Sequence, residues 1–349
     1  MPILAAISYA QRPPVLAPVR PLVAHRLTPP NDPETGRPFD LQPNASRPGK
    51  PVDTEGGLIW TTPARAWTLK GVIAFTIPNG QGVWANLSRR WWSYGTDAGA
   101  GLLDAVTGTT RVYPGVQGPV DDSGIDDHGV PVSLRDVDGA VYGRPAHGGT
   151  LLKLPPGFVD SPRMYSDVLA ASSGPILAGA LTMGDAESPR VLPFVWADDR
   201  AEPKALSMPE GYTQTIVSAL NSRGDVAGLV SGPDLPNQTL IWRADGTVTR
   251  VPVGLWDTRR PAKVNPYSAS EPNLLTEDGL LIGSETSKSA PWGFITTYWD
   301  GQRALWLPNA IEGVHALRFE SMRLTNDGRG LLTRIWDGKA WGWYRVSPR

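Results

Sequence analysis

Residues 220–228, LNSRGDVAG, decide the fold: an apolar segment ends, a polar turn centred on Gly224 follows, and a second apolar segment begins. Asn, Asp and Ser side chains bond their own backbone and glycine accepts a positive φ, so such a turn reverses the chain between two strands. The same turn recurs at spacings of 47, 45, 50, 55 and 49 residues, which indicates an array of similar supersecondary units. The turn glycines are Gly82, Gly129, Gly174, Gly224, Gly279 and Gly328.

An apolar residue followed by proline forms a second mark after each turn. Proline donates no hydrogen bond to a β-ladder, so it fits the end of an edge strand. In the best-defined unit, Asp245-Gly246 separates two alternating segments and predicts a hairpin. Each unit therefore predicts four short antiparallel strands, the first two joined by the turn glycine. The pairs are Tyr113-Pro114, Leu154-Pro155, Met208-Pro209, Val251-Pro252 and Leu307-Pro308.

Four-stranded antiparallel units repeated around an axis are the blades of a β-propeller. The sequence therefore predicts an all-β fold, a six-bladed propeller of four-stranded antiparallel blades. A seventh blade built from N-terminal residues is the alternative, although no glycine turn marks it. The expected blades cover residues 68–114, 119–155, 164–209, 213–252, 270–308 and 315–349.

The last expected blade lacks a fourth strand, because the proline that ends a unit would fall after residue 349. We expect residues 57–62 (GLIWTT) to pair with the C-terminal strand at residues 340–346 and close the ring, which leaves no long exposed edge. The prolines between residues 13 and 51 disfavour helix and central strands. The predicted domains are a Pro-rich N-terminal arm over 1–56 and a propeller over 57–349.

The repeat unit also resembles the HAF-type repeat, in which an Asn/Asp-rich glycine turn leads into a Val-Val-Gly strand and then an aromatic-Leu-Trp strand. Residues 220–228 followed by TLIWRADG (239–246) match this pattern best. LLTEDGLLIG (274–283) followed by TTYWDG (296–301) matches it as well. The resemblance implies a β-propeller and an extracytoplasmic binding role.

Composition excludes several kinds of function. The formal net charge is −1, so bulk electrostatics gives no reason to expect nucleic acid or an anionic membrane as a partner. The absence of cysteine excludes disulfides, thiolate metal sites and a cysteine nucleophile. The apolar run in residues 1–10 is too short to cross a bilayer, and we expect no integral membrane segment.

The acidic run at residues 120–128 (VDDSGIDDH), followed by Asp136 and Asp138, contains the oxygen ligands that Ca²⁺ prefers. The competing interpretation is hairpin chemistry, since Asp126-Asp127 belongs to the repeat's own turn. We expect no metal or cofactor, with Asp136 and Asp138 as the alternative Ca²⁺ ligands.

In a propeller, the loops that join the fourth strand to the next blade and the second strand to the third open on one face. We expect ligand binding on that face. Trp256 with Arg259 and Arg260 would suit an anionic or sugar ligand, with loop packing as the alternative. His315 would begin an inner strand, where it could act as an acid or base or simply be solvated. The candidate ligand-binding residues are Arg163, Tyr165, Tyr212, Trp256, Arg259, Arg260 and His315.

The tryptophans recur in a way that indicates packing. Trp196, Trp242 and Trp299 occupy one place per unit, on the third strand, where an aromatic side chain packs between neighbouring sheets. We therefore expect a non-catalytic platform that binds a protein or glycan. The alternative is a propeller hydrolase or lyase with its active site at the mouth of the central channel, because the fold itself does not decide function.

Overall fold

The computed structural model describes most of the chain from residue 167 onwards and shorter segments before it. The described residues are 20–31, 36, 50–54, 57–61, 65–68, 71–74, 84–85, 90–104, 106–114, 129, 136–137, 140–141, 152–159, 167–170, 175–184, 188–198, 200–251, 271–286, 294–314 and 318–349.

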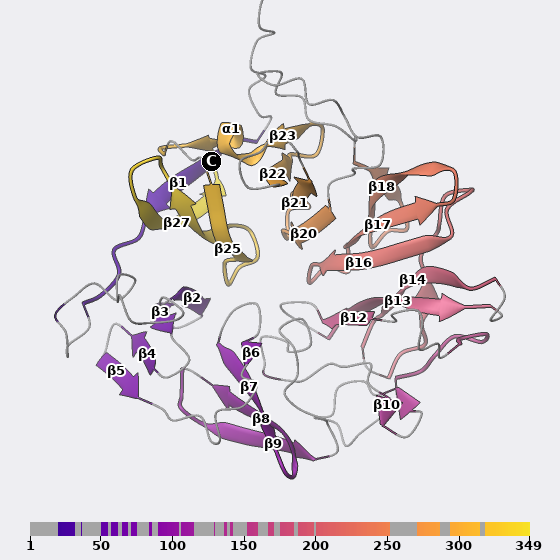
Figure 1. The fold of residues 1–349 in the computed structure, drawn as a ribbon, viewed down its shortest axis with the longest axis horizontal. Helices are drawn as coiled ribbons and strands as arrows, with labels where there is room; N and C mark the ends of the chain where they lie inside the picture. The colour runs from indigo at the N-terminus through magenta and orange to yellow at the C-terminus, as the bar shows by residue number, and fades with distance from the viewer. Residues whose placement is uncertain are drawn as a thin grey trace, which may run out of the picture.

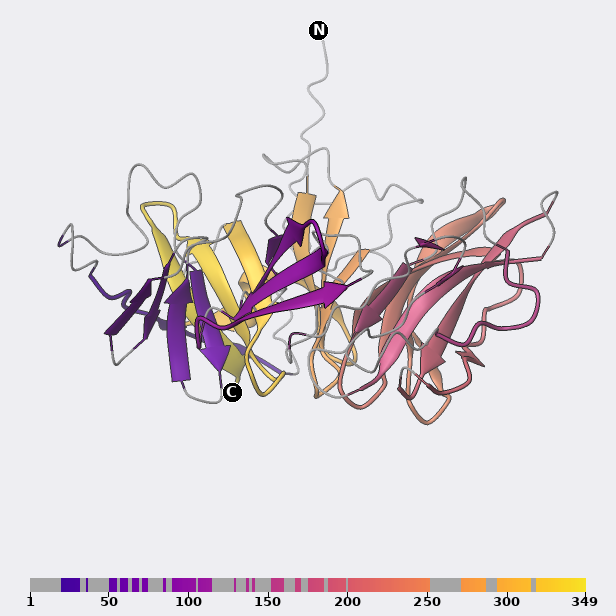
Figure 2. The ribbon, with the colours of Figure 1, turned by 90° about the horizontal axis from the view of Figure 1, so that it is seen from below.

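The described strands form small antiparallel sheets arranged around a common axis, as a β-propeller (Figure 1). Figure 2 shows the same sheets from the side, standing next to one another around the ring. The one helix among the described residues is the four-residue α1 (Leu307–Ala310), directly after β23. The expected all-β propeller arrangement is confirmed.

Five of the sheets have four strands, and within each the spatial order follows the sequence order. In Figure 1 the first strands β12, β16 and β20 lie nearest the centre. The five sheets are β2–β5 (Lys50–Thr54, Gly57–Thr61, Arg65–Thr68, Gly71–Ala74), β6–β9 (Trp84–Ala85, Trp91–Thr96, Gly99–Asp104, Thr110–Pro114), β12–β15 (Asp167–Ala170, Leu177–Met183, Arg190–Trp196, Lys204–Ala205), β16–β19 (Gln214–Leu220, Val226–Gly232, Leu235–Trp242, Val248–Arg250) and β20–β23 (Glu271–Leu275, Leu281–Thr286, Phe294–Trp299, Ala304–Trp306).

Two further sheets differ from this pattern. The C-terminal sheet has five strands in the order β24-β1-β27-β26-β25, and β10 pairs only with β11. The strands are β1 (Leu22–Arg26), β24 (Ile311–Glu312), β25 (Arg318–Leu324), β26 (Leu331–Trp336), β27 (Trp341–Pro348), β10 (Asp136–Val137) and β11 (Ala140–Val141).

The predicted number of blades is wrong: the described residues form five four-stranded blades, in place of six or seven. The prediction took residues 119–155 for a blade, but the strands described in that range are only β10 and β11, and it did not count the β2–β5 sheet. Gly82 precedes β6 in the sequence and so does not join the first two strands of the β6–β9 sheet. The C-terminal sheet, in turn, recruits two additional strands from elsewhere in the chain.

The ring is closed by an N-terminal strand, but the predicted segment is wrong. Strand β1, within the Pro-rich arm, pairs antiparallel with β27, with Ala24 opposite Val346, and parallel with β24. Strand β3 instead pairs with β2 and β4. Both segments are short and apolar, so the pattern alone did not separate them. Trp60 of β3 still packs edge-on against Trp343 of β27, with ring centroids 6.1 Å apart.

The turns that defined the repeat are confirmed in the later sheets. Gly224, Gly279 and Gly328 have φ values of 88°, 76° and 66° and join β16 to β17, β20 to β21 and β25 to β26. Asp245-Gly246 likewise separates the paired strands β18 and β19. We define the end of the sheets with these three glycine turns as the turn face. The opposite end, where β25 begins and residues 337–340 join β26 to β27, is the loop face.

Packing between sheets uses the predicted tryptophans. Trp196, Trp242 and Trp299 end the third strands β14, β18 and β22 and are at most 5% exposed. The indole Nε1 of Trp242 donates to the Ser207 carbonyl of the preceding blade at 2.7 Å. The expected packing role is confirmed.

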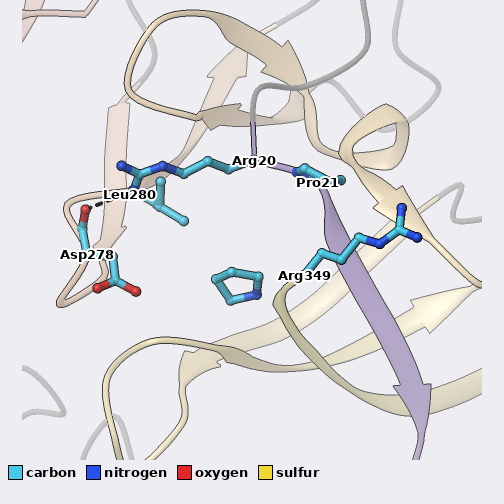
Figure 3. A pocket seen from close by; sticks show the side chains of 6 residues that line it. Arg20, Pro21, Asp278, Leu280 and Arg349 are labelled. Atoms are coloured by element: carbon cyan, nitrogen blue, oxygen red, sulfur yellow. Dashed lines mark hydrogen bonds between the residues drawn. The ribbon is translucent and has the colours of Figure 1, made fainter.

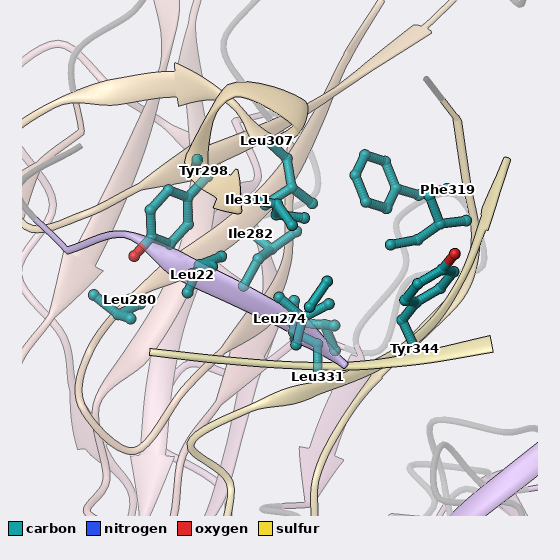
Figure 4. Packing of buried hydrophobic residues seen from close by; sticks show 14 of the residues in the cluster. Leu22, Leu274, Leu280, Ile282, Tyr298, Leu307, Ile311, Phe319, Leu331 and Tyr344 are labelled. Carbon is teal, nitrogen blue, oxygen red and sulfur yellow. The ribbon is translucent and has the colours of Figure 1, made fainter. Parts of the chain in front are cut away.

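The largest core cluster lies where the ring closes and unites β1 with the β20–β23 sheet and the C-terminal sheet. Figure 4 shows Leu22 of β1 next to Leu280 and Tyr298, with Tyr344 and Phe319 at the other end of the cluster. Closure is therefore secured by apolar packing as well as by strand pairing.

Candidate functional site

Most of the predicted ligand-binding residues lie outside the described residues, and their roles stay predictions. These are Arg163, Tyr165, Trp256, Arg259, Arg260 and His315, together with the alternative Ca²⁺ ligand Asp138. Asp136 lies on the two-stranded β10–β11 ladder.

Tyr212 is described, and its surroundings are those of a packing residue. Its side chain is 8% exposed within the apolar cluster of the β16–β19 sheet. Its hydroxyl donates to the Pro236 carbonyl at 3.0 Å, which occupies the only polar group on the ring.

In the described part of the chain, no three His, Asp or Glu side chains lie close enough together to hold a metal ion. No helix in that part is both long enough and apolar enough to span a bilayer.

The strongest candidate site is on the C-terminal sheet at the loop face. Strand register places Arg318 of β25 opposite Trp336 of β26, and Trp336 opposite Trp341 of β27. Glu320 lies opposite Arg334 two residues further along the same strands. Because side chains alternate between the faces of a sheet, all five lie on one face. We name Arg318, Glu320, Arg334, Trp336 and Trp341 the arginine–tryptophan cluster.

The cluster is built around the indole of Trp341. The guanidinium carbons of Arg334 and Arg318 lie 5.1 and 5.5 Å from its ring centroid, within the range of cation–π attraction. The Trp336 ring lies 5.7 Å away, tilted by 50°. All five residues are half-buried, so the cluster is shielded in part and still reachable from solvent.

Glu320 bridges the two guanidiniums. Its Oε1 lies 3.3 Å from Arg318 Nη2 and its Oε2 lies 3.4 Å from Arg334 Nη1. Charge-assisted hydrogen bonds between these groups are normally about 2.7–2.9 Å long. Glu320 therefore balances part of the positive charge without making a close pair with either arginine.

Two buried donors next to the cluster lack an acceptor among the described residues. They are Nε of Arg334 and Nε1 of Trp343, which come from residues opposite each other on β26 and β27. Buried donors are normally satisfied, and exceptions call for an explanation such as a ligand or water. These two N–H groups show that the site has unused hydrogen-bonding capacity.

A β-bulge interrupts β25 directly after Glu320. Ser321 and Met322 together oppose Thr333, and Ser321 has a φ of 54°, the one positive value among the described non-glycine residues. Bulges redirect side chains next to functional sites, and strained backbone conformations gather there. Two other inner strands have bulges at the corresponding level, at Ser218 of β16 and Asn273 of β20.

This cluster was not predicted from the sequence, because its members lie on three successive strands and come together only through the strand register. The sequence pattern indicated the same chemistry, one tryptophan with two arginines, only where the residues were adjacent, at Trp256, Arg259 and Arg260. The available signal was the Gly328 turn. Counting outward from it would place Glu320 opposite Ile335, and the bulge at Ser321 and Met322 shifts the register so that Glu320 lies opposite Arg334.

A pocket of about 320 Å³ lies on the turn face, at the point where the ring closes (Figure 3). Arg20 Nη1 reaches the Asp278 carbonyl at 3.4 Å, and Arg349 Nη1 lies 3.4 Å from Glu312 Oε2. The two guanidiniums thus link segments that are distant in the sequence and meet where β1 closes the ring. The lining residues are Arg20, Pro21, Asp278, Leu280, Pro348 and Arg349.

The Tyr298 hydroxyl, close to this pocket, acts as a neutral hydrogen-bond donor. Burial, with help from the Asp300 carboxylate and against the effect of Arg20, raises the pKa of Tyr298 well above its usual value. The hydroxyl donates to the Arg20 carbonyl at 2.9 Å, which fixes the chain just before β1.

The turn face also holds the most strongly connected carboxylate, Asp225. Its oxygens accept hydrogen bonds from the Ala244 amide at 3.0 Å and the Arg223 guanidinium at 2.7 Å. Burial alone would raise the pKa of Asp225, but these bonds, with Asn221 and Arg243, outweigh it and lower the pKa below its usual value. The group is structural and fully engaged.

No protein-family model matches the chain, and no curated protein matches it. The tricorn protease structure is similar with a TM-score of 0.48 and 10% identity, over 86% of this chain and 33% of that chain. Dipeptidyl peptidase 4 of Porphyromonas gingivalis is similar with a TM-score of 0.42 and 9% identity, over 85% and 48%. The chain spans less than half the length of these two proteins.

Oligogalacturonate lyase of Vibrio parahaemolyticus is similar with a TM-score of 0.40 and 10% identity, over 95% of this chain and 98% of that chain. At such scores and identities, the function must be argued from the residues of this chain alone.

Proposed function

We propose that the chain is a non-catalytic binding platform that engages a protein or glycan ligand through its loop face. The observation that supports this most is the arginine–tryptophan cluster, which combines half-buried aromatic rings, two guanidiniums and a buried donor that lacks an acceptor among the described residues. Aromatic and arginine side chains are the residue types that dominate binding energy at recognition sites.

The predicted residues on the same face belong to this proposal. Trp256, Arg259 and Arg260, with Arg163, Tyr165 and His315, would extend the binding surface beyond the cluster. The proposal includes no cofactor, so chelation of divalent cations with EDTA should leave binding unchanged. Loss of binding with EDTA would instead favour the Ca²⁺ alternative at Asp136 and Asp138.

A ligand screen with paired variants tests the proposal. The purified chain is applied to a glycan array and used in protein pull-downs, alongside Arg334→Gln and Arg223→Gln. Both arginines pair with a carboxylate, but Arg334 lies at the loop face and Arg223 on the turn face. We expect Arg334→Gln to lose the ligand and Arg223→Gln to retain it.

Two other results would change this proposal. Equal binding by both variants would remove the cluster as the site, and a Trp256→Ala, Arg259→Ala double variant would then test the predicted loop. Turnover of a bound glycan or peptide by the wild-type chain would overturn the non-catalytic proposal in favour of a hydrolase or lyase.

A further inference from the structure

We propose that the ligand of the arginine–tryptophan cluster is a carboxylated sugar, and that Glu320 occupies the position of its carboxylate in the free protein. This inference rests on the proposed function and names the ligand class for the same site.

The contacts of Glu320 favour a carboxylate as the ligand group. Arg318 and Arg334 place two guanidiniums around the Glu320 carboxylate. The contacts of Glu320, at 3.3 and 3.4 Å, are longer than a close carboxylate–guanidinium pair. A ligand carboxylate that is free to approach more closely would make the stronger interaction.

The hydrogen-bond donors of the cluster also suit a carboxylate. A guanidinium offers five N–H groups in a planar fork, which suits bidentate binding of a carboxylate. Glu320 contacts Arg334 through Nη1, while the buried Nε of Arg334 has no acceptor among the described residues. Nε1 of Trp343, on the neighbouring strand, is in the same condition. Arg334 therefore keeps a donor that Glu320 does not use, and a ligand carboxylate in the place of Glu320 would supply an acceptor for it.

The two indole rings of the cluster suit the shape of a sugar ring. Trp336 and Trp341 lie side by side and half-buried at the same end of the sheet, next to the guanidiniums. Indole rings offer flat apolar surface with a polar edge, which complements the apolar face of a sugar ring. An acidic peptide fits less well, because the bulge at Ser321 and Met322 breaks the regular ladder to which an extended peptide would add.

The test is calorimetric titration with glucuronate and with glucose, which lacks the carboxylate. We expect the wild-type chain to bind glucuronate at least about tenfold more tightly than glucose, the equivalent of one charge-assisted hydrogen bond. Glu320→Gln removes the competing charge and should tighten glucuronate binding about fivefold while leaving glucose unchanged. Arg334→Gln should lose the preference for glucuronate. Raising the salt concentration should weaken glucuronate binding to the wild-type chain.

The outcomes separate this inference from the proposed function. Weaker glucuronate binding by a folded Glu320→Gln variant would overturn the role of Glu320. A ligand that depends on Arg334 but is a neutral glycan or an acidic peptide would overturn the carboxylated sugar and leave the binding platform intact. If no ligand depends on Arg334, both fail. Because Glu320 is half-exposed, the variant is expected to fold, and circular dichroism with the unfolding midpoint verifies this.

Discussion

The turn face and the loop face of this propeller differ in how completely their described polar groups are hydrogen-bonded. On the turn face, successive turns are tied together: Asn221 Nδ2 donates to the Thr276 carbonyl at 3.1 Å, and the Glu277 amide donates to the Gly328 carbonyl at 2.8 Å. At the loop face, the described cluster holds a carboxylate at 3.3 and 3.4 Å from two arginines and leaves a guanidinium N–H without an acceptor.

The difference indicates a division of roles. Groups that are fully hydrogen-bonded stabilise the native state and have little left to offer a ligand, while a buried donor without a partner is costly until something binds it. The turn face should therefore be sensitive in stability measurements, and the loop face in binding measurements.

The largest expected loss of stability is at β1, the strand that closes the ring. Leu22 is 3% exposed in the closing strand, and Leu22→Ala should lower the free energy of unfolding by about 3 kcal/mol. The matched control is Val112→Ala at a 47% exposed strand position, which should change it by less than about 0.5 kcal/mol. Urea denaturation measures both, and similar effects would contradict closure by β1.

The next effect is on the turn face. Asn221 is fully buried; its Oδ1 accepts from the Arg223 and Asp225 amides, while its Nδ2 donates to Asp225 and to Thr276 of the next blade. Asn221→Ala leaves several of these partners unsatisfied and should cost about 2 kcal/mol of unfolding free energy. An unchanged urea midpoint would show that the hydrogen bonds between successive turns contribute little to the free energy of unfolding.

The dependence of stability on pH should also reveal the contribution of the turn face. The pKa of Asp225 is lower in the folded chain than its reference value of 3.8. The stability it contributes is therefore present above the pKa of the unfolded state and is lost as the pH falls through the folded pKa. Asp225→Asn should reduce the loss of stability between pH 5 and acid, as followed by thermal unfolding.

The smallest effect on stability should be at the loop face. Arg334→Gln removes one long, partly exposed ion pair and a cation–π contact, so the free energy of unfolding should fall by less than about 1 kcal/mol. Ligand binding should nevertheless be lost. A stability loss as large as that of Asn221→Ala would make the cluster structural.

The sequence predicted the parts of this molecule that depend on local chemistry. The turns at Gly224, Gly279 and Gly328, the hairpin at Asp245-Gly246 and the buried tryptophans of the third strands all followed from residue type and spacing. Each depends on a few neighbouring residues, so a single sequence suffices.

What the sequence missed depends on contacts between distant segments. Gly56 and Gly57, where β3 follows β2 in the sequence, lie outside the 45–55-residue spacing of the other turn glycines, so the β2–β5 sheet was not counted, and the wrong apolar segment was chosen as the closing strand. The arginine–tryptophan cluster needed the register of three strands, including the bulge at Ser321 that shifts it. Only part of the candidate site was accessible from the pattern, namely that the loop face would contain it.

The most direct test of the account is a nuclear magnetic resonance titration of the indole N–H signals with glucuronate, assigned with Trp→Phe variants. The account predicts that the signals of Trp341 and Trp343 shift on binding. Those of Trp196 and Trp242, whose N–H groups already bond the Lys153 and Ser207 carbonyls, should stay in place. Saturable shifts at Trp196 or Trp242 with none at Trp341 and Trp343 would place the ligand elsewhere and contradict it.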